Sequence, residues 1–141
     1  MPAYVAETDE IARKEAGEHV ESLFNKFIMS PAQYKLPTGY SSLESYKAVM
    51  EGKYKVRENY LSCEALIENG MFLCGSAATV IEKLEEYQSE MGFGNIAPML
   101  QFGTLPAGLT EKNLRIFAEE VIPKVRHLGV SPKIAQSAAA E

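Results

Sequence analysis

The stretch Met71-Phe72-Leu73-Cys74-Gly75-Ser76 decides the fold class of this 141-residue chain. Its apolar run stands between two glycines and shows no alternation, which is typical of a strand covered on both faces, as in a parallel sheet. Ser76 is a suitable N-cap for a following helix. The apolar residues of that helix recur at helical spacing, at Val80, Ile81, Leu84, Tyr87 and Met91. The stretch therefore predicts a buried strand that turns directly into an amphipathic helix.

A second unit of this kind opens the chain. Ala3-Tyr4-Val5-Ala6 is short and β-prone, and Thr8 follows as an N-cap, with Asp9 and Glu10 in the first helical turn. We expect a helix of about five turns after it, ended by Pro31. Its apolar face would comprise Ile11, Ala12, Ala16, Val20, Leu23, Phe24, Phe27 and Ile28.

The middle of the chain, about 30–70, reads as a helical and loop excursion. Ser41-Ser42-Leu43-Glu44 is a capping box that predicts a short helix to about Met50. A second short helix is expected over about 61–69, ended by Asn69-Gly70. The spacing of the tyrosines fits neither a helix nor a strand, so interface and loop-packing roles stay equally open. These tyrosines are Tyr34, Tyr40, Tyr46, Tyr54 and Tyr60.

The C-terminal third predicts one more strand and helix. A strand is expected over 95–100, weakened by Pro98, which has no N–H for a sheet ladder. Thr110 would cap the last helix, and Pro123 predicts a kink in it, or its end near Val121. The expected buried stripe is Leu114, Phe117, Ala118, Val121, Ile122, Val125 and Leu128. We expect residues 129–141 to form a frayed, flexible tail.

Alternating strands and helices indicate an α/β fold with parallel strands and right-handed crossovers. About three strands with flanking helices are expected in a single domain over 1–128. So few strands leave two sheet edges and one poorly covered face, which invites association. We therefore expect a homo-oligomer, and helices on both faces of the sheet would count against it.

Composition excludes several classes of protein. Lys and Arg number 14 against 19 Asp and Glu, a net charge of −5, and the isoelectric point is about 5.2. This balance argues against nucleic acid or an anionic membrane as partner. No signal peptide and no membrane-length apolar run is apparent. Cys63 and Cys74 lack zinc-site spacing and are expected to be reduced thiols, which favours a cytoplasmic protein.

Two stretches carry a resemblance to a known family. Residues 72–80, followed by Lys83-Leu84, and residues 99–106, followed by 117–123, resemble the C-terminal part of the bacterial-luciferase-like flavin-dependent monooxygenases. Ala77 stands where that family usually has proline. The opening, 4–10, is similar to the family's sixth strand and following helix. The resemblance implies a partial TIM barrel comprising strands six to eight.

Members of that family oxidise small organic substrates with reduced flavin mononucleotide (FMN) or a deazaflavin. The resemblance thus implies an oxidoreductase fragment with FMN as a possible cofactor. We expect no catalysis and no bound cofactor from this chain alone, because residues around a barrel site come from several strand ends. Another chain could supply the missing strands. The alternative function is a non-catalytic, truncated α/β oligomerisation or interaction module.

No catalytic residue or metal ligand stands out, but four binding residues do. Gly75 and Ser76 lead from a strand into a helix N-terminus, which can hold a cofactor phosphate; the alternative is an ordinary capped turn. Gln101 could hydrogen-bond a substrate and Phe102 could form a pocket wall; the alternative is a loop that satisfies its own backbone.

Other chemistry-bearing residues are assigned to the surface. His19 and His127 are expected on exposed helix faces without the partners that a base or a metal site needs. Glu85-Glu86 and Glu119-Glu120 are neighbours in sequence and diverge on a helix, so we expect two solvated faces.

Overall fold

The first described element begins at Ala3 and the last ends at Val125. The computed structural model describes residues 1–28, 42–45, 47–48, 51 and 60–128. Two of its segments, η1 and η2, are π-helical turns. The elements, in chain order, are β1 (Ala3–Ala6), α1 (Asp9–Ser22), η1 (Leu23–Phe27), α4 (Cys63–Glu68), β2 (Leu73–Ser76), α5 (Ala77–Met91), α6 (Ala107–Ile116), η2 (Phe117–Val121) and α7 (Ile122–Val125).

The sheet places β1 at its centre. β1 and β2 are parallel, with Ala3 opposite Leu73. On the other side of β1, the Ala3 N–H donates to the Met99 carbonyl at 3.0 Å, and the Met99 N–H donates to the Met1 carbonyl at 2.9 Å. The expected strand over 95–100 is wrong in length, since only a single bridge at Met99 forms. Pro98, which lacks an N–H, directly precedes that bridge.

A buried side chain continues the sheet where the third strand stops. The Asn113 amide oxygen accepts the Val5 N–H at 2.9 Å. Its amide nitrogen donates to the carbonyls of Ala3 and Leu100, both at 2.9 Å. Asn113 is fully buried, so it satisfies strand backbone groups that water does not reach.

The α/β class is confirmed, with two parallel strands rather than about three among the described residues. The sheet order differs from that expected for a partial barrel. Successive strands of a barrel are neighbours, so the second of three would lie in the middle. Here the middle position belongs to β1, between β2 and Met99.

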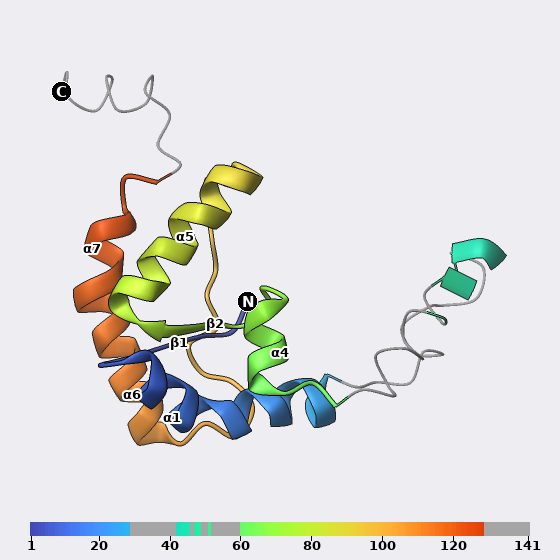
Figure 1. Ribbon diagram of the computed structural model, residues 1–141, viewed down its shortest axis with the longest axis horizontal. Coiled ribbons are helices and arrows are strands. Elements are labelled where there is room, and N and C mark those ends of the chain that lie inside the picture. The colour runs from blue at the N-terminus through green and yellow to red at the C-terminus, as the bar shows by residue number, and fades with distance from the viewer. Residues whose placement is uncertain (29–41, 46, 49–50, 52–59, 129–141) are drawn as a thin grey trace.

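Helices cover both faces of the sheet. Figure 1 shows α5 above the two strands and α1 below them. Alternate residues of β1 accordingly enter two separate cores: Tyr4 and Ala6 pack with α1 and α4, whereas Ala3 and Val5 pack with α5 and η2. The expected poorly covered face is therefore absent from the described part of the sheet, which counts against the homo-oligomer expected from it.

The helix starts predicted from local sequence are largely confirmed. The hydroxyl of Thr8 accepts the Ile11 N–H at the start of α1. Ser76 caps α5 in the same way. Ser62, which was not predicted as a cap, does the same for α4, and this helix begins at Cys63. Gly92 ends α5 with a left-handed conformation, at φ 65°. These ends depend on residues close in sequence, which is why pattern alone can find them.

The last helix departs from prediction at its start and on its buried side. It begins at Ala107, so Thr110 is not its cap. Leu114 and Ala118 are exposed, whereas Asn113 is buried. The helix does not end near Val121 but continues through a π-turn into α7, and the kink expected at Pro123 stays a prediction. The π-turn η2 ends at Val121, with the Ile122 N–H bonded to the Phe117 carbonyl, just before Pro123.

Other expectations have mixed outcomes. The exposed ends Phe27 and Ile28 do not belong to the buried face expected of the first helix. Of the capping box, Ser41 lies outside the described residues, and Ser42 accepts the Ser45 N–H at 3.1 Å. Tyr60 is exposed and donates to Glu21 at 2.9 Å. The other tyrosines of the excursion (34, 40, 46 and 54) and the tail 129–141 also lie outside the described residues.

Candidate functional site

The carboxyl edge of the sheet is the first place to look for a site, because open α/β proteins bind ligands there. β1 leads at this edge into Glu7, Thr8 and Asp9, and β2 leads into α5 at Ser76. Polar side chains from α1, α5 and α6 reach this edge. They form two networks, one on each side of β1.

The first network centres on Asp9, whose side chain binds the N-terminus of α5. Its carboxylate accepts the Ser76 N–H at 2.6 Å and the Thr79 hydroxyl at 2.8 Å. The Ser76 N–H is the main cause that holds the pKa of Asp9 below its usual range. Gly75 is needed for this approach, since a Cβ there would lie 2.7 Å from the carboxylate oxygen. A helix N-terminus attracts an anion, and here that anion belongs to the protein.

Gly75 and Ser76 lie at the expected strand-to-helix turn. The Asp9 carboxylate lies next to them, which the sequence did not predict. From its place in the first turn of α1, Asp9 was expected only to interact favourably with the dipole of that helix. Its reach across to α5 has no local signal, because Asp9 and Ser76 are separated by 67 positions. The role of Gly75 and Ser76 in holding a phosphate stays a prediction.

Tyr4, Glu15, Lys112 and Glu7 form the second network. The Tyr4 hydroxyl donates to Glu15 at 2.9 Å, and the Lys112 ammonium contacts both Glu15 oxygens at 2.9 Å. The same ammonium lies 2.7 Å from Glu7. Burial and then the Glu15 hydrogen bond raise the pKa of Tyr4. The hydrogen bond from Lys112 lowers the pKa of Glu7. One cation is thus shared by two carboxylates.

Gln101 and Phe102, the expected substrate contacts, lie in different environments. Gln101 is exposed. Phe102 is 2% exposed, and its ring packs edge-on against Phe72 with the centroids 5.5 Å apart. Phe102 therefore belongs to the core on the α1 side of the sheet.

His19 corrects the expectation of a surface histidine. It is buried, and its Nδ1 lies 2.8 Å from the Thr104 hydroxyl. The neighbouring Gly103 has φ 55° and approaches the His19 carbonyl so closely that a Cβ would overlap it. The loop after Leu100 is therefore held against α1. His127 is exposed, as expected.

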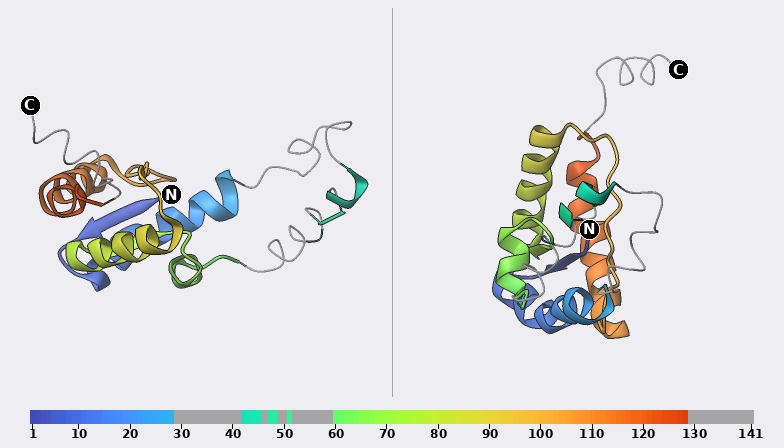
Figure 2. Two further views of the ribbon diagram at one scale, coloured as in Figure 1. Left: turned by 90° about the horizontal axis from the view of Figure 1, so that it is seen from above. Right: turned by 90° about the vertical axis from the view of Figure 1, so that its right-hand side faces the viewer.

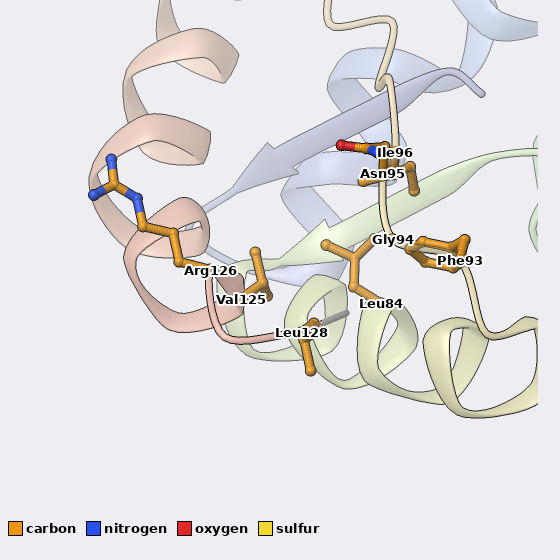
Figure 3. Close-up of a pocket in the computed structure, with 8 residues that line it drawn as sticks. All are labelled: Leu84, Phe93, Gly94, Asn95, Ile96, Val125, Arg126 and Leu128. Carbon is orange, nitrogen blue, oxygen red and sulfur yellow. The ribbon is translucent and has the colours of Figure 1, made fainter. Parts of the chain in front are cut away.

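A pocket of about 360 Å³ lies away from both networks. Figure 3 shows it between α5, the segment 93–96 and the end of α7. Its walls are mainly apolar; Asn95 and Arg126 are the polar residues, and the Arg126 guanidinium extends away from the pocket in Figure 3. The lining residues are Leu84, Phe93, Gly94, Asn95, Ile96, Val125, Arg126 and Leu128.

The cysteines are buried and unpaired, as expected for reduced thiols. Burial raises the pKa of Cys63 to about 11 and also raises the pKa of Cys74, so both are protonated near neutral pH. The described residues contain no cluster of three His, Cys, Asp or Glu side chains suited to a metal ion. Among the helices described, none has the length and apolar character needed to cross a bilayer.

No family model, no curated protein and no solved structure matches this chain.

Proposed function

We propose that this chain is a non-catalytic α/β oligomerisation module. The observation that carries the proposal is the Asp9 carboxylate at the N-terminus of α5. In an α/β protein that position is suited to a cofactor phosphate. A phosphate there would have to displace Asp9 or approach its negative charge, and both cost free energy.

The second network supports the same conclusion. Lys112 is one cation near this edge, and its ammonium already contacts Glu7 and Glu15. Arg13 is a second, since its charge helps to lower the pKa of Asp9. Glu15 also accepts the Tyr4 hydroxyl. A ligand would gain little from groups whose hydrogen bonds are already made. The free, protonated cysteines support a cytoplasmic location for the module.

The alternative is the C-terminal fragment of a luciferase-like flavin monooxygenase. One observation favours it: β2 turns into α5 through Gly75 and Ser76, with Ser76 as cap, as the resemblance implies. This alternative needs a further chain to supply the missing barrel strands. It also needs β2 to become the middle strand, which the pairing of β1 with both β2 and Met99 disfavours.

Gel filtration coupled to light scattering, with flavin absorbance recorded after incubation with millimolar FMN, distinguishes the two functions. A colourless oligomer is the expected result. Flavin that elutes with the protein would overturn the module and favour the fragment. A colourless monomer would contradict oligomerisation.

Asp9→Asn tests the carrying observation directly. The variant removes the negative charge but keeps a hydrogen-bond acceptor beside Ser76. If the carboxylate alone keeps phosphate out, this variant binds FMN more tightly than the wild type in a fluorescence titration. Equal, absent binding by the variant and the wild type would mean that the Asp9 charge is not what keeps a phosphate out, and would remove the observation that carries the proposal.

A further inference from the structure

The two cysteines of the chain lie in one hydrophobic core, and neither belongs to the two networks at the carboxyl edge of the sheet. Cys63 begins α4, and Cys74 lies in β2, eleven positions further along the chain. Both side chains are buried and free in the core that α1 and α4 form against the sheet. Two free thiols within one core are a pair that oxidation can join.

The backbone joins α4 to the strand close to both thiols. The Phe72 N–H donates to the Leu66 carbonyl at 3.1 Å. Leu66 lies one turn after Cys63 and, like it, is a buried residue of α4. Phe72 lies two positions before Cys74, and both side chains enter the same core. Cys63 and Cys74 therefore flank one contact between α4 and the strand.

Helix α1 places the Cys63 sulfur on the inner side of α4. Position 17 of α1 is glycine, and a Cβ added there would lie 3.6 Å from that sulfur. The sulfur thus packs directly against the helix that covers this face of the sheet.

The electrostatic interactions of the thiols agree with this placement. Burial is the main cause that raises the pKa of Cys74, and a charge on Cys63 is the second. Burial is also the main cause for Cys63, and the charge of Arg13 on α1 opposes the shift at both cysteines. Such an interaction weakens with distance, so both thiols lie close to one another and to α1.

We propose that Cys63 and Cys74 form a reversible disulfide that ties α4 to β2, with a low-molecular-weight disulfide as the oxidant. One cysteine thiolate attacks a sulfur of the oxidant and forms a mixed disulfide, and a small thiolate leaves. The second cysteine thiolate then attacks the protein sulfur of that mixed disulfide and releases the second small thiolate. Two protein thiols thus lose two electrons and two protons, and the oxidant takes up both as two small thiols.

The reaction requires local opening, because a buried, protonated thiol is a poor nucleophile. Helix α4 has only six residues, and a short element opens at a lower free-energy cost than the whole domain. Opening of α4 exposes Cys63, and its closure returns Cys63 to Cys74. Oxidation should therefore be slow, and the bond should hold α4 on the sheet once formed. The switch requires no oligomer, so it goes beyond the proposed function.

Incubation of the full chain with glutathione disulfide in native buffer tests the pair. Mass spectrometry without reductant should show a monomeric chain lighter by two hydrogen atoms, and peptide mapping should show one link, between Cys63 and Cys74. Cys63→Ser and Cys74→Ser are the matched controls, since each keeps one thiol and takes up one glutathione at most. The map on the wild-type chain decides the result even where a variant fails to fold. Thiols that stay reduced, or a link between two chains, would overturn the proposal.

The same reaction in urea shows whether the fold itself brings the thiols together. The equilibrium constant for the link, measured against glutathione, should be at least about tenfold higher in native buffer than in urea, because a bond that stabilises the fold is in turn favoured by it. Equal constants would mean that the two thiols meet only through their spacing in the chain, which would also overturn the proposal. Neither measurement depends on the oligomeric state, so failure here leaves the proposed function standing.

Discussion

The side chain of Asn113 makes three hydrogen bonds to backbone groups while it is fully buried. It stands within a helix, where asparagine has only modest propensity. The unfavourable helix propensity of Asn113 is offset because its side chain hydrogen-bonds backbone groups of Val5, Ala3 and Leu100. The short third strand leaves these groups without partners. A polar residue inside an apolar stripe is the one sequence signal that could have found it.

Asn113→Ala should therefore destabilise the fold far more than an exposed asparagine does. Each buried backbone group that loses its partner costs roughly 1–3 kcal/mol, so a loss of about 3 kcal/mol is expected in urea denaturation. Asn69→Ala is the control, since the Asn69 side chain bonds a carbonyl of its own exposed helix end. Equal effects of the two substitutions would refute the role of Asn113 in the sheet.

Asp9 links stability to pH. Its pKa is lowered in the folded protein, chiefly by the Ser76 N–H. Its contribution to the free energy of unfolding is thus complete above its unfolded value of about 3.9 and is lost as the pH falls through the lower folded value. Asp9→Asn should lower stability at pH 7 and flatten the dependence below about pH 4. Parallel denaturation curves of variant and wild type across pH would contradict this.

Among the elements, the starts of α1 and α5 follow local sequence, whereas the start of α6 and the length of the third strand do not. Thr8, Ser62 and Ser76 cap helices through residues three positions away, so their chemistry is visible in sequence. The third strand depended on a partner far along the chain. Met99 pairs with Met1 and Ala3, and the ladder does not extend toward Pro98. Which residues of the last helix are buried likewise depends on the elements that pack against α6.

The loop after the third strand gives a test at this scale. Gly103→Ala should destabilise the protein by about 1–3 kcal/mol, because φ is positive and a Cβ would overlap the His19 carbonyl. Gly108→Ala is the matched control, since a Cβ there meets nothing within 4 Å. In helix α6 it should stabilise by up to about 1 kcal/mol. Thermal unfolding measures both, and a neutral Gly103→Ala would contradict the close packing of this loop against α1.

At the largest scale, the described residues form a small sheet with one hydrophobic core on each of its two faces. Helices α1 and α4 cover one face and α5 with η2 covers the other, as the two views of Figure 2 also show. This arrangement removes the bare sheet face on which an oligomer was first expected.

Hydrogen exchange should reveal this organisation. The amides of Ala3 and Val5 are hydrogen-bonded inside the sheet and should exchange slowest, near the rate of global unfolding. The amides of 94–97 make no backbone hydrogen bond to described residues and should exchange fast. Equal protection of the two segments would mean that the third strand is longer than one bridge.

The sequence by itself determined the α/β class, the cap at Thr8 and the strand-to-helix turn at Ser76, because each depends on neighbours within a few residues. Only the tertiary structure decided the central place of β1, the burial of Asn113 and His19, and the Asp9 carboxylate at α5. These depend on groups that are as many as 110 positions apart. Periodicity carries no information about such partners, since it reports which side of an element is apolar and not what that side meets.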